Sequence, residues 1–230
     1  MFELNKNLNV RTEKVYDCNF QRLDDVHIVD NFYSDPDEIV KFFLDQNAPL
    51  HKGAENGLNG ISFEDRRFSA GTNLSYPAYE FLQNIHGQVP ENHGAVSTNQ
   101  TRFFKQEFNN YKDNYWWPHT DEGYTAIVYL NKNDYVNGTN LYEQLVAVDQ
   151  RERSAIGRMK KFSASLEATE HQEPWKPKVY YNCLKHIEPA YNRLVLFNGL
   201  CYHGMNICND RYFDDEYRLY QVFFFKNGTI

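Results

Sequence analysis

The first fifty residues alternate between apolar and polar positions in a way that predicts a strand followed by a helix. Residues 26–33 alternate partly and are rich in β-branched and aromatic types, which is typical of a strand. Asp35 can cap a helix, Pro36 suits its first turn, and Glu38 completes a pattern similar to a capping box. The apolar residues among 39–43 then share one helical face, so we expect a helix of about three turns.

A second, shorter helix is predicted over residues 77–85. Phe81, Leu82 and Ile85 would face inward on this helix. The Gly- and Asn-rich run 53–60 separates the two predicted helices and is expected to be a loop.

From about residue 100 the pattern changes to short apolar segments separated by turn signals, which is typical of strands. The strands predicted are Thr101–Phe108, Tyr124–Leu130, Asn140–Tyr142, Val179–Cys183, Arg193–Phe197 and Tyr217–Phe225. This order of elements predicts an α+β fold that is mainly β. Its core would be a double-stranded β-helix (jelly roll) buttressed by the N-terminal helices.

The length of 230 residues fits one domain, because all-β barrels and jelly rolls often use this length as one unit. We predict a single domain over 1–230, with a strand–helix lead-in at 1–98 and the jelly-roll core at 99–230. Segment 145–178 is charged and lacks clear periodicity. It is expected to be a long insertion between strands, and such insertions often carry function.

The overall charge argues against a nucleic-acid partner. The formal net charge is −7 and the isoelectric point is near 5.6, whereas a broad nucleic-acid surface needs a basic face. Net charge says nothing about distribution, so a local basic strip stays open as an alternative.

Cysteine usage and the N-terminal sequence are typical of a soluble protein of a reducing compartment. The first ten residues lack the apolar run of a signal peptide, and no segment approaches the length of a membrane span. The cysteines form no CxxC pair and no zinc-ribbon spacing. We therefore expect a cytoplasmic protein with free thiols at Cys18, Cys183, Cys201 and Cys208.

One pair of polar residues is suited to metal binding. His119 and Asp121 stand at positions i and i+2, which share one face of a strand, so both side chains can reach one ion. His203 is the best third ligand, because it follows the apolar strand 194–197 and a turn. Two histidines and one carboxylate on one side of a metal leave three open positions, as non-haem iron(II) oxygenases require.

An HxD pair alone is a weak signal, because most such tripeptides are surface polar residues. The other histidines lack an equivalent context and are not expected to bind a metal: His27, His51, His86, His93, His171 and His186.

The motifs around these residues resemble the core of prolyl-4-hydroxylase-type 2-oxoglutarate oxygenases. That family shows an HxD motif, a YLN strand and a small-residue turn leading into a strand. An EP…R-L-hydrophobic-F strand, a distal histidine and a final strand opening with Arg or Lys follow. All of these motifs occur here in order, at 119–121, 126–132, 137–142, 187–197, 203–204 and 217–225.

The resemblance implies roles for five residues. His119, Asp121 and His203 match the metal triad. Arg218 matches the basic residue that pairs with the far carboxylate of 2-oxoglutarate, a task suited to a planar guanidinium. Tyr129 matches a tyrosine whose hydroxyl helps to hold the same carboxylate.

Structural alternatives stay open for both cosubstrate residues. Arg218 can form an ion pair with Glu216 just before the strand, and Tyr129 can be a core aromatic. An arginine inside an aromatic strand must find a buried anion or reach solvent, which favours the functional role. The long polar segment 207–216 departs from the family pattern and leaves Arg211 as a weaker rival for the carboxylate.

Several aromatic residues near the HxD motif have open roles. The family often has a tyrosine before HxD that contacts the cosubstrate, with candidates here at Phe104, Phe108, Tyr111 and Tyr115. The aromatic residues beside the motif can line a pocket for a peptide or an amino acid, or can be core: Tyr115, Trp116, Trp117 and Tyr124.

The resemblance implies a dioxygenase that uses iron(II), 2-oxoglutarate and O₂ to hydroxylate a substrate. The carboxylate at Asp121 favours hydroxylation, because related halogenases carry a small residue there. The expected substrate is a peptide or protein side chain, an amino acid or another small molecule, without a membrane partner. A non-catalytic jelly-roll binding or structural protein is one alternative, and a zinc hydrolase with the same ligands is a lower-ranked one.

Overall fold

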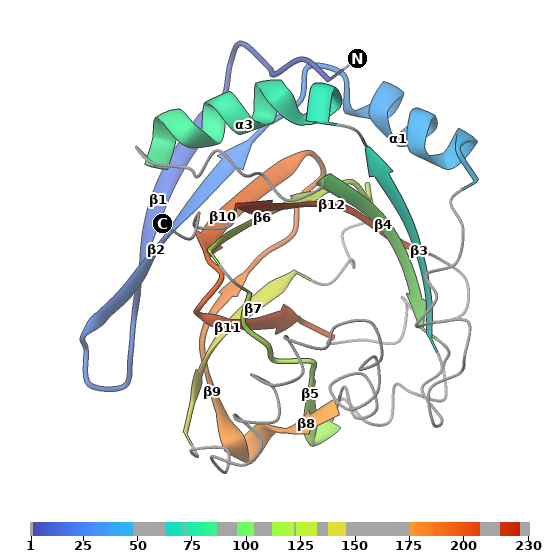
Figure 1. Ribbon diagram of the computed structural model, residues 1–230. Coiled ribbons are helices and arrows are strands. Elements are labelled where there is room, and N and C mark those ends of the chain that lie inside the picture. The colour runs from blue at the N-terminus through green and yellow to red at the C-terminus, as the bar shows by residue number, and fades with distance from the viewer. Residues whose placement is uncertain are drawn as a thin grey trace.

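The computed structural model describes residues 2–47, 63–70, 72–86, 96–103, 112–121, 123–132, 138–145, 175–207 and 217–225. Within these residues the chain is mainly β (Figure 1). The strands are β1 Asn9–Tyr16, β2 Arg22–Asp30, β3 Phe63–Ala70, β4 Val96–Phe103, β5 Asn114–Trp116, β6 Tyr124–Tyr129, β7 Thr139–Gln144, β8 Trp175–Pro177, β9 Tyr181–Ile187, β10 Arg193–Asn198, β11 Tyr202–Met205 and β12 Arg218–Phe225. The helices are α1 Pro36–Asp45, α3 Thr72–His86 and the short 3₁₀ helix η3 Lys178–Tyr180.

The described strands form antiparallel sheets. A seven-stranded sheet has the order β1-β2-β10-β6-β12-β4-β3, a three-stranded sheet has the order β11-β7-β9, and β5 pairs with β8. Strands distant in sequence thus become neighbours, since β6 pairs with β10 on one side and with β12 on the other. Helices α1 and α3 lie along one face of the seven-stranded sheet, and the three-stranded sheet lies on its other side (Figure 1).

Helix α1 begins as the sequence predicts. The Asp35 side chain accepts a hydrogen bond from the backbone N–H of Glu38 (3.0 Å), and Pro36 occupies the first turn. Ile39 and Phe43 are buried in the core on one face of the helix. Burial of each such side chain stabilises the fold by about 1.5–3 kcal/mol.

Helix α3 is longer than predicted, and its predicted start at Pro77 is wrong. The helix begins at Thr72, so Pro77 lies inside it. Proline lacks an N–H to donate and favours a first turn, which is why the sequence pattern predicts the start of the helix at this residue. Leu82 is fully buried, and Phe81 and Ile85 are partly buried against the same core, so the predicted inward face is confirmed.

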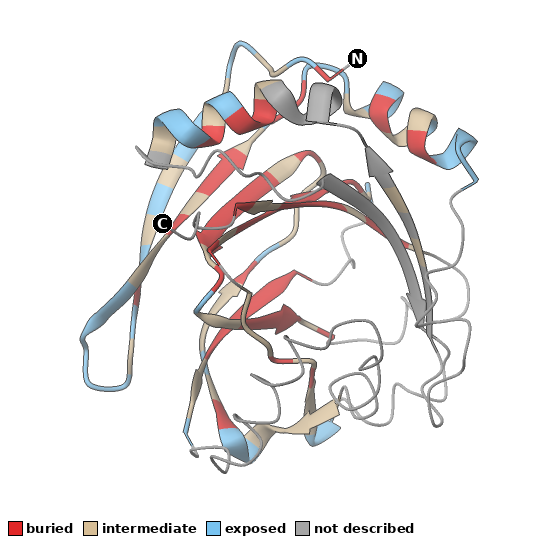
Figure 2. Cartoon of the chain, viewed as in Figure 1, coloured by how far each residue is buried: buried red, intermediate tan, exposed pale blue. Residues whose placement is uncertain are grey.

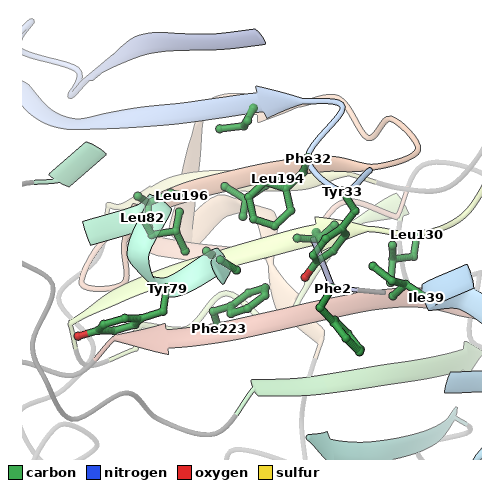
Figure 3. Close-up of a cluster of buried hydrophobic side chains, with 14 of the residues drawn as sticks. Phe2, Phe32, Tyr33, Ile39, Tyr79, Leu82, Leu130, Leu194, Leu196 and Phe223 are labelled. Atoms are coloured by element: carbon green, nitrogen blue, oxygen red, sulfur yellow. The ribbon is translucent and has the colours of Figure 1, made fainter. Parts of the chain in front are cut away.

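The larger apolar core lies between the helices and the seven-stranded sheet. Figure 2 shows buried positions on the inner side of the described helical turns and along the central strands. Aromatic rings fill much of this space: Phe32 and Tyr33 meet edge to face with centroids 4.7 Å apart (Figure 3). The Tyr33 hydroxyl donates to Gln221 on β12 (2.5 Å), so its polar tip is satisfied inside the core.

A second apolar core separates the seven-stranded sheet from the three-stranded sheet. On β6, Val128 packs on the helix side, whereas Ile127 and Tyr129 pack on the other side. On β12, Leu219 packs on the helix side and Tyr220 on the other side. Alternation along a strand therefore directs the odd positions of β6 and the even positions of β12 into the space between the sheets.

The sequence predicts the central strands best. Strands β6, β10 and β12 coincide with predicted segments to within one residue. Strands β1, β3, β5, β8 and β11 have no predicted counterpart. The first two lie at the sheet edges and are rich in polar residues, and the others are three or four residues long. Their period-2 pattern is therefore too weak to detect.

Four predicted strands have shifted limits. Strand β2, Arg22–Asp30, begins and ends earlier than the predicted 26–33. Strand β4 lies earlier in the chain than the predicted Thr101–Phe108, and β7 extends beyond Asn140–Tyr142 at both ends. Strand β9 begins at Tyr181 rather than Val179, because the residues just before it form η3.

Some predicted features lie outside the described residues, including the run 53–60 and positions 146–174 of the predicted insertion. The described end of that insertion contains β8, which pairs with β5. Cys18, Cys183 and Cys201 are free thiols, as expected. In the part of the chain that the structure describes, no helix has the length and apolar character of a membrane span.

Charged side chains join β1, β2 and β10. Asp30 accepts hydrogen bonds from Arg193 (2.5 Å) and Arg11 (2.7 Å), and Arg193 also donates to the Glu188 carbonyl (2.8 Å). Burial alone would raise the pKa of Asp30, but the two guanidinium groups outweigh it and hold that pKa below its usual value. The side chains of Asp30 and Arg193 are 23% and 15% exposed, so solvent screens them less than a surface pair.

We expect Asp30→Asn to lower the free energy of unfolding at pH 7 by about 1.5–3 kcal/mol, the range for hydrogen bonds to charged groups. A carboxyl group whose folded-state pKa is lowered contributes stability above its unfolded pKa, and loses it as pH falls through the folded pKa. The Asp30 contribution should therefore begin to fall below about pH 4, the ordinary aspartate range, and disappear once the pH is below the lowered folded-state pKa. Urea unfolding at pH 7 and in steps below pH 4 measures both effects. Equal acid sensitivity of the variant and the wild type would contradict this role.

Candidate metal site

Backbone pairing between distant segments brings His119 and His203 side by side. The His119 N–H donates to the His203 carbonyl (3.0 Å), and the His203 N–H donates back to the His119 carbonyl (2.9 Å). The two residues form an antiparallel bridge, and their imidazole centroids lie 4.4 Å apart. His203 lies on β11, which the three-stranded sheet holds in place through β7.

Asp121 reaches this pair from irregular backbone, so the strand predicted for the HxD motif is wrong. Trp117 has a left-handed backbone conformation (φ 47°) and Pro118 follows it, which ends β5 before the motif. The Asp121 N–H instead donates to the Gly199 carbonyl (2.7 Å). A Cβ on Gly199 would lie 2.8 Å from the Asp121 carbonyl oxygen, so this close approach requires glycine.

A second glycine positions the distal histidine. Gly204 follows His203 on β11, and a Cβ there would lie 2.5 Å from the carbonyl oxygen of Trp116. Backbone atoms leave no room for even one methyl group at this point. Because Gly204 has no side chain, β11 can lie against the end of β5. This close packing fixes the position of His203 relative to β5.

Hydrogen bonds to backbone carbonyls set the protonation of both imidazoles. Nδ1 of His119 lies 2.7 Å from the Trp117 carbonyl oxygen, and Nδ1 of His203 lies 2.9 Å from that of Cys201. A carbonyl oxygen only accepts, so each Nδ1 carries a proton. Both Nε2 atoms face Oδ2 of Asp121, at 3.8 Å for His119 and 3.2 Å for His203. Metal-bound histidines use the same arrangement, in which a hydrogen bond from one nitrogen directs the other at the ion.

The Asp121 carboxyl group is ionised at neutral pH. Burial alone would raise its pKa, but the hydrogen bond from His203 and the charges of both imidazoles lower that pKa to about 2. Thr125 on β6 also donates to Oδ2 (3.2 Å). His203 is 4% exposed, whereas the side chains of His119 and Asp121 are 37% and 25% exposed. The cluster is therefore closed behind His203 and open beside His119.

The three side chains can hold one divalent metal ion. Their ligand atoms lie within 4.8 Å of one another, and no other such group of three converges among the described residues. Two imidazole nitrogens and one carboxylate oxygen on one side of an ion suit a transition metal and leave other positions open. The structure thus brings together the residues that the sequence predicts as ligands.

Arg218 and Tyr129 also lie together, in the space between the two larger sheets. The Arg218 guanidinium lies over the rings of Tyr129 (5.8 Å) and Tyr220 (4.5 Å). Arg218 is 5% exposed, and its Nε and Nη2 atoms have no hydrogen-bond partner among the described residues. The Tyr129 hydroxyl is hydrogen-bonded to Oγ1 of Thr139 (2.7 Å). Burial raises the pKa of Tyr129 although the nearby Arg218 charge lowers it, so the hydroxyl keeps its proton.

Two threonines belong to the site although they carry no motif signal. Thr125 donates to the Asp121 carboxylate, and Thr139 contacts the tyrosine beside the arginine. The alternation of side chains along a strand is the sequence signal that could have identified both threonines. Thr125 lies on the same face of β6 as Tyr129, and Thr139 lies on the same face of β7 as Leu141.

Of the aromatic residues beside the motif, Trp117 makes a ring contact with a predicted ligand. Its ring centroid is 6.1 Å from that of His119. Trp116 and Tyr115 instead pack against aromatic rings of β8 and β7, and Tyr124 packs on the helix-side core. The remaining predicted candidates lie outside the described residues: Phe104, Phe108, Tyr111, Arg211 and Glu216.

Residues 17–219 match the protein family described as "Family of unknown function (DUF6445)". The chain belongs to this family. The matched span contains the three candidate ligands and Arg218, so the whole site lies within the DUF6445 sequence pattern.

Among curated proteins, none matches the sequence. A solved structure that resembles the chain is that of an N-substituted L-amino acid dioxygenase from Burkholderia ambifaria AMMD in complex with alpha-KG. The similarity covers 94% of each chain at 9% sequence identity, with a TM-score of 0.36. At this TM-score the likeness bears neither on the fold nor on the activity of the chain.

Proposed function

We propose that this protein is an iron(II)- and 2-oxoglutarate-dependent dioxygenase that hydroxylates its substrate. The proposal rests on one observation: two features lie in the same space between the seven-stranded and the three-stranded sheets. One is the convergence of His119, Asp121 and His203 with both imidazoles directed by carbonyl hydrogen bonds. The other is the buried Arg218 guanidinium, whose Nε and Nη2 atoms find no hydrogen-bond partner within the described part of the chain.

The histidine–carboxylate cluster fits a metal ion electrostatically. Each imidazole already donates from Nδ1, so its neutral form would point the Nε2 lone pair at the ionised Asp121. That contact is repulsive unless a proton or a cation lies between the groups. A divalent ion held by all three side chains would remove the repulsion by lying between the three ligand atoms.

The arginine group fits the far carboxylate of 2-oxoglutarate. A buried guanidinium with two donors that no described residue satisfies is suited to an anion that accepts two hydrogen bonds in one plane. His203 pairs with Leu141, and Thr139 lies two residues along β7, or about 7 Å. Thr139 is bonded to Tyr129 beside Arg218. Strand β7 thus connects the cluster, through Leu141, with the arginine group, through Thr139.

When bound, iron(II) and 2-oxoglutarate supply the oxidative chemistry, which with O₂ yields succinate, CO₂ and a substrate carrying one added oxygen atom. The protein's own residues bind and orient. Arg218 and Tyr129 hold the far carboxylate, and Thr139 fixes the direction of the Tyr129 hydroxyl. The apolar walls around His203, including the Phe197 ring 4.8 Å from its imidazole, exclude water from the buried side.

The remaining parts of the proposal concern architecture and setting. We propose that the two opposed antiparallel sheets form a double-stranded β-helix within a single domain over 1–230. The protein would act in the cytoplasm on a peptide or protein side chain or on an amino acid.

A turnover assay tests the proposed function. We expect succinate release that requires iron(II), 2-oxoglutarate and O₂ together, and that stops when a chelator removes the metal. Candidate amino acids, peptides and nucleosides are screened by intact mass for the gain of one oxygen atom. Hydrolysis with zinc and none of this turnover with iron would favour a hydrolase, and failure to bind iron would favour a binding protein.

A further inference from the structure

The backbone ladder between β6 and β12 ends beside Arg218. Strand β6 ends at Tyr129, and the last backbone hydrogen bond at this end runs from Leu130 N–H to the Leu219 carbonyl (3.0 Å). In a regular antiparallel pair, the Leu219 N–H would donate back to the Leu130 carbonyl. It donates instead to a side chain, that of Asn131.

The Asn131 amide takes the place of a peptide group opposite Arg218. Its Oδ1 accepts from the Leu219 N–H (2.6 Å), and its Nδ2 donates to the Tyr217 carbonyl (2.8 Å). These two backbone groups stand on either side of Arg218 in sequence. A carboxamide suits this task because, like a peptide group, it offers one donor side and one acceptor side in a plane.

We infer that Asn131 is the positioning residue for the Arg218 guanidinium, and this role rests on the proposed use of 2-oxoglutarate. On its other side Arg218 pairs with Thr101 of β4. On the β6 side, beyond the Leu130–Leu219 bond, the Asn131 side chain holds the two backbone groups that flank Arg218. Without it the first residues of β12 are free to fray, since strand ends open most easily.

The chain contains a matched control for this contact. Asn192 makes the same two bonds to one residue elsewhere: its Oδ1 accepts from the Tyr33 N–H (2.8 Å), and its Nδ2 donates to the Tyr33 carbonyl (2.9 Å). Asn192 is buried, and its bonds hold the segment after β2 on the helix side of the sheet. The described hydrogen bonds of the Asn192 side chain go to Tyr33 and not to β12, so we expect loss of its amide to disturb the fold without moving Arg218.

The test compares Asn131→Asp with Asn192→Asp in the iron-loaded protein. Each change keeps the acceptor and replaces the donor with an oxygen that faces a carbonyl. For Asn131→Asp we expect the KM for 2-oxoglutarate to rise about tenfold, below the 10²-fold that a 1 Å misplacement can reach. The kcat at saturating 2-oxoglutarate should stay within about twofold, because the metal ligands are untouched. Asn192→Asp should lower the Tm while leaving KM unchanged.

Amide hydrogen exchange supplies a second readout that does not depend on turnover. Exchange at the Leu219 N–H should accelerate in Asn131→Asp and stay at the wild-type rate in Asn192→Asp. If Asn131→Asp does not fold, Asn131→Ala removes both bonds without adding a repelling oxygen and serves the same comparison.

The possible failures are distinguishable. An Asn131 variant with the wild-type KM, or an equal rise in KM for both asparagine variants, overturns the positioning role while leaving the dioxygenase in place. A wild-type protein that binds iron but neither binds nor consumes 2-oxoglutarate overturns the proposed function. The positioning role toward the cosubstrate fails with it, even if exchange at Leu219 still depends on Asn131.

Discussion

His203→Ala should abolish iron-dependent turnover and weaken iron(II) binding by more than about 100-fold. Loss of a residue that only hydrogen-bonds to a metal ligand costs up to about 100-fold, and loss of a ligand itself should cost more. His203 is the buried member of the cluster, and its Nε2 lies 3.2 Å from Oδ2 of Asp121. Removing His203 leaves only two of the three proposed ligands, His119 and Asp121, which are too few to hold the ion tightly. His119→Ala should have the same effect on binding with a smaller effect on packing, because that side chain is 37% exposed.

Metal-dependent thermal shifts measure this result without relying on turnover. A ligand present at 100 times its Kd stabilises the folded state by about 2.7 kcal/mol, so iron(II) should raise the Tm of the wild type but not of the variants. His186→Ala is the matched control: Nδ1 of this partly buried histidine donates to Oδ1 of Asn140 (2.7 Å), but the residue lies outside the cluster. An iron-induced shift in His203→Ala equal to that of the wild type would remove His203 from the metal site.

The parts of the fold that the sequence predicts are those with strong local patterns. Helix α1 has a capping aspartate, a first-turn proline and one apolar face, and it begins where these signals place it. Strands β6, β10 and β12 are central and apolar on both faces, so their limits follow from composition. The polar edge strand β1 and the three-residue strands β5 and β8 gain their structure from partners distant in sequence, which no local pattern records.

The candidate site is predictable in its residue types but not in its backbone. His119 and Asp121 converge with His203, although not because they share a strand face as expected. A left-handed Trp117 and a close approach at Gly199 produce the convergence instead. Both features depend on tertiary packing, and a glycine in a sequence does not reveal which backbone will pass over it.

The hydrogen bonds that orient the site residues could not be predicted from the sequence, for a related reason. The carbonyl groups that orient the two imidazoles belong to Trp117 and Cys201, and every residue offers such a carbonyl. Asn131 belongs to the YLN motif, yet only the register of β12 against β6 places its amide beside Arg218. Register is a long-range property, and it decides what an otherwise ordinary polar residue does.

Arg218→Ala should raise the 2-oxoglutarate requirement by about thirty-fold or more while iron binding survives. Loss of one partner of a desolvated charge pair costs roughly 2–5 kcal/mol, which corresponds to that change in affinity. The measurement is the KM for 2-oxoglutarate together with iron-induced thermal shifts. Arg211→Ala should do little, and the reverse pattern would move the carboxylate anchor to Arg211.

Arg218→Met separates a ligand-binding arginine from a structural one. An arginine that holds the fold together should cost stability when replaced, because its buried partners lose their bonds. Nε and Nη2 of Arg218 have no such partners among the described residues, and cation–π contacts with Tyr129 and Tyr220 offset only part of the cost of burying the charge. A methionine of similar length removes that charge and still fills the space. We therefore expect the ligand-free variant to be as stable as the wild type or more stable, as measured by urea unfolding. In the iron-loaded variant, 2-oxoglutarate should no longer give the stabilisation that it gives the iron-loaded wild type. A large loss of stability in the ligand-free variant, with cosubstrate stabilisation intact, would assign Arg218 to the fold and leave the far carboxylate without its anchor.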